Sequence, residues 1–377
     1  MTPTKFSIIV IGYNVENFIE QAVASCAFPK RDDYEVIYVD NGSTDLSASL
    51  AQDTATELAI PYRSIHLDKN YGPGHARNEG VKAANGEFIV FLDGDDFLSP
   101  HALDRLNEMV LQNPAQVYLY NYARFHENGS RINNMNTKLL TEGYKTEPAE
   151  IEKILRNFGV AWNKMYRKDF LVQKSIIFGE GLYEDIEWNF KVLILASPLY
   201  VTPDVLVYYR HRARSVLRSR DMHHFDALSQ GHKMYDFYAR DPQLAALYGL
   251  RTYSYIRDVI TRILAENRLP ASARGRFVRE ASALLRNFRK LIGKKKKTWT
   301  ERLIDTQSYA AYVGGIKALR LYDRTEKAII EAATPYYKKY KQPYIEFLYR
   351  NRMVKQPIQN NLVFMDAFGA RRSTAIH

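Results

Sequence analysis

The sequence predicts an α/β protein in which a mostly parallel sheet, covered by helices on both faces, is followed by a mainly helical part. Three observations lead to this prediction. Over roughly the first 220 residues, apolar β-branched runs alternate with stretches of helical periodicity. Polar residues follow directly on the ends of several of these runs. From about residue 223 the strand-like runs stop, and long helical patterns take over.

The predicted strands are short runs rich in Val, Ile and aromatic residues, a composition typical of buried strands. Turns that contain Gly, Asn or Asp bound them. Because a helical stretch separates each run from the next, parallel pairing is expected. The expected strands cover residues 6–11, 34–39, 62–67, 88–92 and 116–120.

The segments between the strands carry apolar residues at helical spacing, as Ile19 and Val23 do. Residues 126–145 are polar and are expected to form a loop, and a further cationic loop is expected over 208–215. In the first part, helices are expected over 16–27, up to about 58, and over 75–84, 101–111, 151–158 and 185–196. In the second part they are expected over 223–239, 243–267, 272–292 and 316–340.

A chain of 377 residues with 46% hydrophobic residues is long and apolar enough for two or so domains with large cores. We expect the boundaries 1–222, 223–360 and 361–377. The single cysteine rules out an intramolecular disulfide framework and suits a reducing compartment. No apolar run approaches the ~20 residues that span a bilayer, and no signal-peptide pattern is seen. We therefore expect a cytoplasmic location.

Charge is unevenly distributed along the chain. Residues 1–220 carry a formal charge of −4, and residues 221–377 carry +15. A basic half can contact nucleic acid, an anionic membrane surface or an anionic polymer, and a basic surface that only aids solubility is the alternative. We expect the helical C-terminal part to hold an anionic polymer or a lipid-linked acceptor, to dock on the inner face of the membrane, or to mediate homo-oligomer contacts. The run Arg286–Lys297 is the strongest basic cluster, and a solvated helix end is the alternative interpretation. No recognised nucleic-acid-binding motif is present, so no nucleic acid is expected.

Three acidic residues follow the strand over 88–92, namely Asp93, Asp95 and Asp96. Carboxylates this close repel one another unless a cation lies among them. A divalent metal ion with oxygen ligands, Mn or Mg, fits this pattern, and a nucleotide diphosphate would complete its ligands. A solvated acidic turn is the alternative.

Two other predicted strands end in polar residues: Tyr13 follows the first strand, and Asp40 and Asn41 follow the second. In parallel-sheet proteins, ligands bind at the carboxyl ends of the strands. The sequence therefore predicts a ligand site where these residues meet the acidic cluster.

Four motifs together resemble the family-two inverting glycosyltransferases of the GT-A fold, a nucleotide-sugar-binding fold. They are residues 7–14, 39–45, 70–80 leading to 91–96, and the pair Glu184-Asp185. The order and spacing agree with that family over roughly the first 220 residues. The sequence departs from the family at Ile11-Gly12, and at Asn41, where many members have Asp.

The resemblance implies a role for each matching residue. Tyr13 would flank the nucleotide base, Arg77 would reach the base or the diphosphate, and Asp95 would ligate the metal with Asp93. Asp185 would be the general base, with Glu184 beside it; acids at a helix N-terminus are the alternative. The residues expected at the nucleotide sugar are Ile11, Tyr13, Asp40, Asn41, Asn70, Arg77, Asp93, Gly94 and His211.

Trp162 and Lys164 resemble the acceptor-side segment of the family, and a core Trp is the alternative. Residues 361–373 resemble the opening strand of polyol-phosphate (CDP-glycerol-type) transferases, which often follow a family-two domain. We expect from this that the chain is part of a longer two-enzyme polymerase.

Sugar transfer from a nucleotide sugar needs a neutralised leaving group and a carboxylate that takes the acceptor's proton. We therefore expect a metal-dependent inverting glycosyltransferase that uses a nucleotide sugar, with UDP as the expected nucleotide. The expected acceptor is a hydroxyl of a bacterial surface polymer, such as teichoic acid or a capsule. Two alternatives are a catalytically inactive nucleotide-sugar-binding scaffold and a nucleotidyltransferase.

Overall fold

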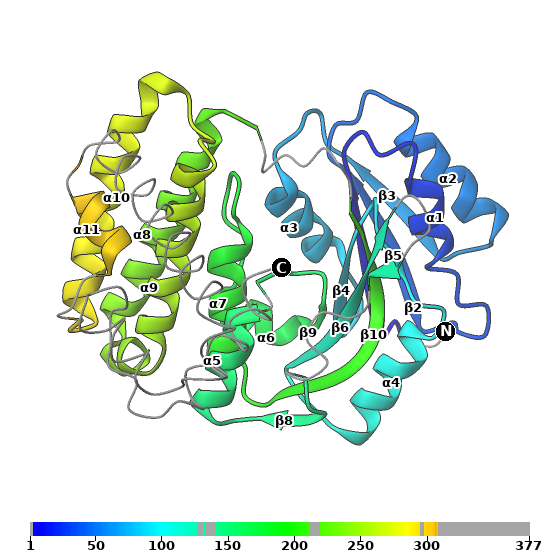
Figure 1. The fold of residues 1–377 in the computed structure, drawn as a ribbon. Coiled ribbons are helices and arrows are strands. Elements are labelled where there is room, and N and C mark those ends of the chain that lie inside the picture. Colours follow the sequence, from blue (N-terminus) through cyan, green and yellow to red (C-terminus); the bar gives the residue numbers. More distant parts are fainter. Residues whose placement is uncertain are drawn as a thin grey trace, which may run out of the picture. The chain divides into compact units, whose positions relative to one another are not determined.

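The computed structural model describes residues 3–126, 131–132, 140–157, 159–211, 219–294, 298–305 and 307. These residues fall within one compact unit, Met1–Gln307. A ten-stranded sheet occupies one side of this unit, and helices α8–α11 gather on the other (Figure 1). Among the described residues, no helix combines the length and the apolar character needed to cross a membrane.

The sheet has the strand order β3-β2-β1-β4-β9-β6-β10-β5, with β7 paired to β6 and β8 to β10. Strands β1 to β4, β6 and β10 run in one direction, whereas β9 lies antiparallel between β4 and β6. The strands are β1 (Phe6–Gly12), β2 (Tyr34–Asp40), β3 (Tyr62–His66), β4 (Phe88–Asp93), β5 (Phe97–Leu98), β6 (Val117–His126), β7 (Arg131–Ile132), β8 (Gly143–Lys145), β9 (Lys164–Arg167) and β10 (Leu199–His211).

Helices cover the sheet and then form a separate group at the C-terminal side of the unit. In the first part they are α1 (Ile19–Ala24), α2 (Ser47–Glu57), α3 (Pro73–Ala83), α4 (Ala102–Gln112), α5 (Pro148–Asn157), α6 (Lys168–Gln173) and α7 (Asp185–Leu195). In the second part they are η2 (Met222–Phe225), α8 (Asp226–Arg240), α9 (Pro242–Ala265), η3 (Ala271–Ala273), α10 (Arg274–Leu291) and α11 (Trp299–Asp305).

The predicted fold class is confirmed, and the predicted strands lie within a few residues of β1–β4 and the start of β6. The cationic loop expected over 208–215 was wrong in its first half, because β10 continues to His211 by pairing with β6 and β5. The short elements β5, β7, β8, β9, α6 and α11 were not predicted, and β7 and β8 lie within the segment 126–145 that was expected to be a loop. The predicted helix over 316–340, the segment 361–373 and residues 295–297 of the Arg286–Lys297 run lie outside the described residues.

The second group of helices packs on the first part through α7 and α5, which contact α8 and α9. The mainly helical part begins at η2, so the change from strands to helices expected near residue 223 is present. The described residues nevertheless form one compact unit. The domain boundaries proposed from the sequence therefore stay a prediction.

The core of the sheet determines where the functional edge lies. Every residue of β1 is buried, as are all residues of β4 except Asp93. Helix α3 packs directly on β1 at Gly80, where an added Cβ would overlap the side chain of Ile9. This close approach requires glycine, and it sets the distance at which α3 packs on β1.

The contact between Gly80 and Ile9 predicts that Gly80→Ala lowers the free energy of unfolding by about 1–3 kcal/mol, because overpacking a core forces its side chains apart. Gly275→Ala in α10 is the matched control, since its added Cβ would come no closer than 3.5 Å to any atom, the nearest being the flexible side chain of Arg279. Urea unfolding of both variants measures the difference. Equal stability of the two variants would contradict the packing argument.

Candidate active site

The carboxyl ends of β1, β2 and β4 meet at one edge of the sheet. The register pairs Gly12 with Asp40 and Ile11 with Asp93. The backbone N–H of Gly94 donates to the carbonyl of Ile11 at 2.8 Å. The structure thus brings together the strand ends that the sequence predicted to meet.

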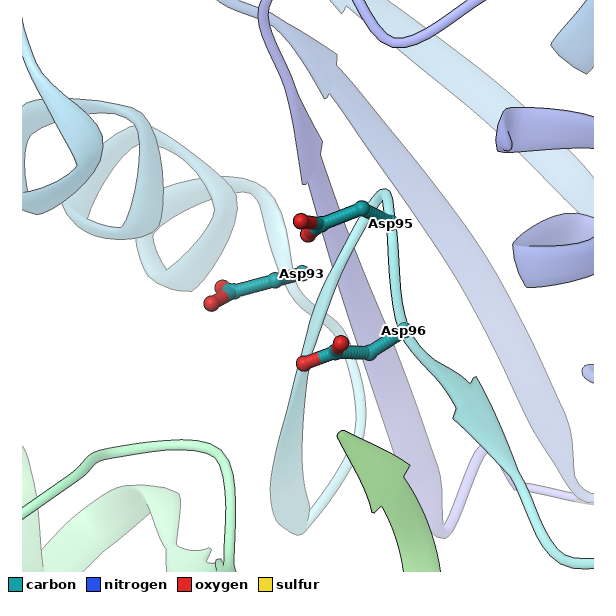
Figure 2. A group of neighbouring side chains, drawn as sticks. All are labelled: Asp93, Asp95 and Asp96. Carbon is teal, nitrogen blue, oxygen red and sulfur yellow. The ribbon is translucent and has the colours of Figure 1, made fainter. Parts of the chain in front are cut away.

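The acidic residues after β4 form a tight turn, in which the Asp96 N–H donates to the Asp93 carbonyl at 2.9 Å. One carboxylate oxygen from each of Asp93, Asp95 and Asp96 lies within 4.8 Å of the others. The three carboxylates point to the same side (Figure 2). An all-oxygen donor set of this kind fits Mg or Mn. Asp96 is only 1% exposed, so Asp93 and Asp95 are the more accessible candidates for a metal.

Arg210 supports this turn from β10. Its backbone N–H donates to Asp96 Oδ1 at 2.8 Å, and its Nε donates to the Asp95 carbonyl at 2.9 Å. The guanidinium lies over three rings, Phe18, Phe97 and Phe125, at 5.0–5.9 Å from their centroids. The sequence analysis missed this role because Arg210 was assigned to a loop. His211 follows at the end of β10, and its expected place at the nucleotide sugar stays a prediction.

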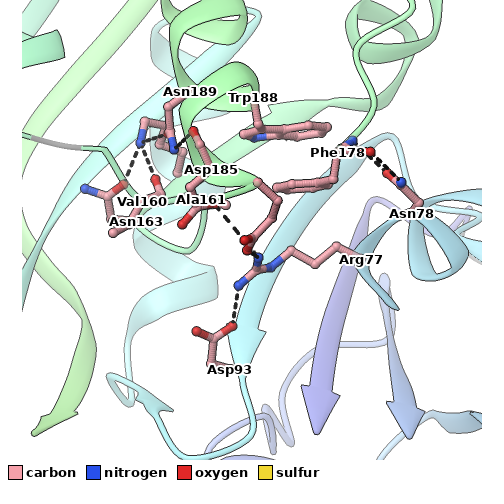
Figure 3. Close-up of polar contacts among 12 residues, drawn as sticks. Arg77, Asn78, Asp93, Val160, Ala161, Asn163, Phe178, Asp185, Trp188 and Asn189 are labelled. Carbon is pink, nitrogen blue, oxygen red and sulfur yellow. Dashed lines mark hydrogen bonds and ion pairs between the residues drawn. The ribbon is translucent and has the colours of Figure 1, made fainter. Parts of the chain in front are cut away.

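Arg77 in α3 connects the acidic turn to the start of α7. Its Nη2 donates to Asp93 Oδ1 and its Nη1 to Glu184 Oε1, both at 2.8 Å (Figure 3). The side chain is only 3% exposed. Its guanidinium thus bridges two carboxylates in the structure, and the expected contact with the base or diphosphate stays a prediction.

Asp185 begins α7, and its Oδ1 lies 3.9 Å from Arg77 Nη1. This oxygen is buried and has no hydrogen-bond partner among the residues that the structure describes. Burial, followed by the neighbouring charge of Glu184, raises the pKa of Asp185 above its usual value. A carboxylate with a raised pKa is a stronger proton acceptor, which suits a general base.

Lys164 is fully buried, and its Nζ donates to the Val160 carbonyl and to the side-chain oxygens of Asn163 and Asn189, at 2.6–2.9 Å. The acceptor role expected from the sequence stays a prediction. Burial lowers the pKa of Lys164 to about 7. Asn189 Nδ2 also donates to the Asp185 carbonyl at 2.8 Å. Lys164 therefore supports the first turn of α7 through Asn189.

Trp162 is also buried, with 5% of its surface exposed. Its ring stacks on Tyr209 at 5.2 Å between centroids, and Tyr122 packs edge-on against it. This arrangement favours the alternative interpretation of Trp162 as a core residue. Stacking of Trp162 on an acceptor sugar would require the Tyr209 ring to move away.

The expected base pocket lies at the ends of β1 and β2. Tyr13 is 44% exposed, and Asp40 is buried beside it. Asn41 donates to Asn70 Oδ1 and accepts from the backbone N–H of Tyr71, both at 3.0 Å. A carboxylate cannot donate, so only an amide at position 41 makes both bonds. This gives a physical reason for the departure from Asp at that position.

The loop 178–183 leads into α7 and is held from both sides. Asn78 in α3 makes two hydrogen bonds, at 2.9 and 3.0 Å, with the backbone of Phe178 (Figure 3). The Phe178 ring stacks on Trp188 at 3.7 Å. Tyr183 has a φ of +64°, a left-handed conformation that costs an aromatic residue about 1–3 kcal/mol. Such strain persists only where neighbouring contacts enforce it.

Comparison with known proteins shows which proteins this chain is similar to. Residues 7–173 match Glycosyl transferase family 2. The chain is 31% identical over 217 residues to the uncharacterized glycosyltransferase EpsJ of Bacillus subtilis, a match that covers 56% of this chain and 62% of EpsJ. It is 28% identical over 213 residues to the poly(ribitol-phosphate) beta-N-acetylglucosaminyltransferase TarS of Staphylococcus aureus, covering 54% of this chain and 35% of TarS.

The fold matches a crystal structure of TarS residues 1–349 with a TM-score of 0.65 at 18% identity, covering 84% of this chain and 92% of that one. A TarS structure in complex with UDP-GlcNAc matches with a TM-score of 0.64 at 19% identity, over the same shares of both chains. These likenesses confirm the GT-A-like fold. The chain spans less than two thirds of the length of the EpsJ and TarS proteins that it matches in sequence.

The raised pKa of Asp185 predicts that Asp185→Asn stabilises the protein at neutral pH. The folded state holds the Asp185 proton more tightly than the unfolded state, so ionisation costs stability as pH rises above about 4. Asparagine stays neutral and avoids this cost. We expect the variant's Tm to exceed that of wild type by about 2–4 °C near pH 8, with the difference vanishing near pH 4.

Thermal unfolding across that pH range measures this difference. Asp53→Asn, on the exposed face of α2, is the control for removal of a carboxylate. A variant that is less stable than wild type at pH 8 would show that the Asp185 carboxylate stabilises the fold.

Proposed function

We propose that this chain, in which residues 7–173 are a family 2 glycosyltransferase domain, transfers a sugar from a UDP-linked donor to a hydroxyl of an anionic bacterial surface polymer. The proposed reaction inverts the anomeric centre and depends on a divalent metal. One observation carries the proposal: a buried carboxylate oxygen of Asp185, without a hydrogen-bond partner in the described part of the chain, lies 3.9 Å from Arg77, which is paired with Asp93 of the acidic turn.

The two carboxylate groups suit two different tasks. Asp93 and Asp95 would hold Mn or Mg, which when bound supplies positive charge to the diphosphate leaving group. Asp185 would take the proton of the acceptor hydroxyl as its oxygen attacks the anomeric carbon. Attack from the side opposite the leaving group inverts that carbon. No enzyme nucleophile is needed, unlike in a retaining hydrolase with its closely spaced carboxylates.

The nucleotide would lie along the ends of β1 and β2. Tyr13 offers an exposed ring for the base, while Asp40, Asn41 and Asn70 line the pocket. The UDP-GlcNAc complex of TarS supports UDP as the nucleotide. Gly94 lies directly against the Ile11 carbonyl, which keeps the turn free of side chains at that position.

An anionic acceptor is supported by charge and by the name of one relative. TarS is named as a poly(ribitol-phosphate) transferase. The outer face of α10 carries cationic side chains at helical spacing, and these are Arg276, Arg279, Arg286 and Lys290. We propose that this face meets a phosphate-bearing polymer or a lipid-linked acceptor. Peripheral membrane contact and homo-oligomerisation stay predictions.

The products of turnover discriminate between the proposed function and its alternatives. A glycosyltransferase releases a nucleoside diphosphate, whereas a nucleotidyltransferase releases pyrophosphate from a nucleoside triphosphate. An inactive scaffold would bind nucleotide and release neither.

A panel of nucleotide sugars with Mn tests the proposal directly. A UDP-sugar should raise the Tm and slowly release UDP, because a bound ligand stabilises the native state. Asp185→Asn should keep the Tm shift and lower turnover by about 10²–10⁴-fold, since only the base is removed. Near wild-type transfer by this variant would disprove the base assignment, and pyrophosphate release from UTP would favour a nucleotidyltransferase.

Asp95→Ala should separate the metal role from the base role. We expect UDP affinity in the presence of Mn to fall by about 10-fold or more, because the cluster loses one of its two more accessible carboxylates. Without metal, wild type and variant should bind UDP equally. Calorimetric titration with UDP, with and without Mn, measures both values, and an unchanged affinity with Mn would refute this role.

A further inference from the structure

The loop that leads into Asp185 is held by the helical part of the chain. Asp226, the first residue of α8, accepts the Leu182 N–H through its Oδ2 at 2.9 Å. Gly181 adopts a φ of +81°, and an added Cβ would overlap the Asp226 carboxylate. Gln230, one turn further along α8, donates to the Glu180 carbonyl at 3.4 Å.

His224 in η2 holds the next residue of the loop. Its ring is fully buried between the Tyr183 hydroxyl, 2.8 Å from Nδ1, and the Ser219 carbonyl, 2.9 Å from Nε2. Because a carbonyl only accepts, Nε2 carries the proton, and in the neutral ring Nδ1 accepts from the tyrosine hydroxyl. The hydrogen bond therefore fixes the position of Tyr183, the residue with left-handed backbone.

The contact with His224 acts on Tyr183, the residue immediately before Glu184 and Asp185. The Tyr183 carbonyl accepts the Ile186 N–H at 3.0 Å, so the strained residue forms part of the turn that starts α7. Glu184 and Asp185 follow at once. A change in the Tyr183 backbone would rotate this turn and displace the Asp185 carboxylate from its place beside Arg77.

We propose that Asp226 and His224 are positioning residues, through which the helical part holds the loop 178–183 in the strained conformation that places Asp185 for proton transfer. This inference rests on the proposed role of Asp185 as general base. It assigns the start of the helical part a task in catalysis that is separate from holding an acceptor.

Asp226→Ala in the full chain tests the inference, with Asp241→Ala as the matched control. Asp241 caps α9 by accepting the N–H groups of Gln243 and Leu244, and it makes no contact with the loop among the described residues. Both variants remove a carboxylate from a helix start, so both are expected to lose similar stability. Asp226→Asn keeps an oxygen acceptor for Leu182 and should behave almost as wild type.

Three measurements are made on each variant. In Asp226→Ala, amide hydrogen exchange over residues 182–187 should rise at least 10-fold. The kcat for UDP release from UDP-GlcNAc should fall about 10–100-fold, because small displacements of a catalytic group are costly. The KM and the affinity for UDP should stay within about twofold of wild type. Asp241→Ala should show neither the faster exchange nor the lower kcat.

The outcomes separate this inference from the proposed function. Unchanged exchange in Asp226→Ala, or faster exchange with unchanged kcat, overturns the inference even if Asp185→Asn is inactive. Absence of turnover in wild type bears on the proposed function, and the exchange arm still decides whether the contacts hold the loop. If Asp226→Ala does not fold, Tyr183→Phe, which removes only the hydroxyl that contacts His224 and Arg268, should show the same changes to a smaller degree.

Discussion

The site depends on the ion pairs of one buried guanidinium. Arg77 is held between Asp93 and Glu184, so the end of β4 and the start of α7 are fixed relative to each other through a single side chain. Removing one partner of a buried ion pair typically costs about 3–5 kcal/mol, because the remaining charge is left uncompensated. Arg77 therefore requires both carboxylates to stay in place, and this requirement keeps the acidic turn and Asp185 at a constant separation.

Around this bridge, several features lower stability in order to shape the site. Asp185 carries a raised pKa, Lys164 is buried with a lowered pKa, and Tyr183 has strained backbone. Proteins tolerate such local costs where function needs them, and offset them elsewhere. Here the aromatic packing of Phe178 on Trp188 and the close contact of α3 with β1 at Gly80 supply rigid support.

The sheet and its functional edge were predictable from the sequence, because strand and helix periods are local signals and parallel strands end at the same edge. The surroundings of individual side chains were not. Nothing local distinguishes Lys164 from a surface lysine, and its burial follows from contact with Asn189, 25 residues away. Arg210 likewise meets Asp95 and Asp96 across more than 110 residues. Such contacts depend on strand order, which the motifs do not encode.

The acidic residues show how the same chemical group acquires different roles. Asp96 is buried against the Arg210 backbone, whereas Asp93 shares Arg77 and keeps about a quarter of its side chain exposed. Asp185 has the same exposure, and among the described residues its Oδ1 has no hydrogen-bond partner and lies 3.9 Å from Arg77 Nη1. Burial and the neighbouring charge of Glu184 raise the pKa of Asp185, which makes it a stronger proton acceptor. Environment, rather than residue type, thus assigns the leaving-group side to Asp93 and the proton-accepting side to Asp185 in the proposed reaction.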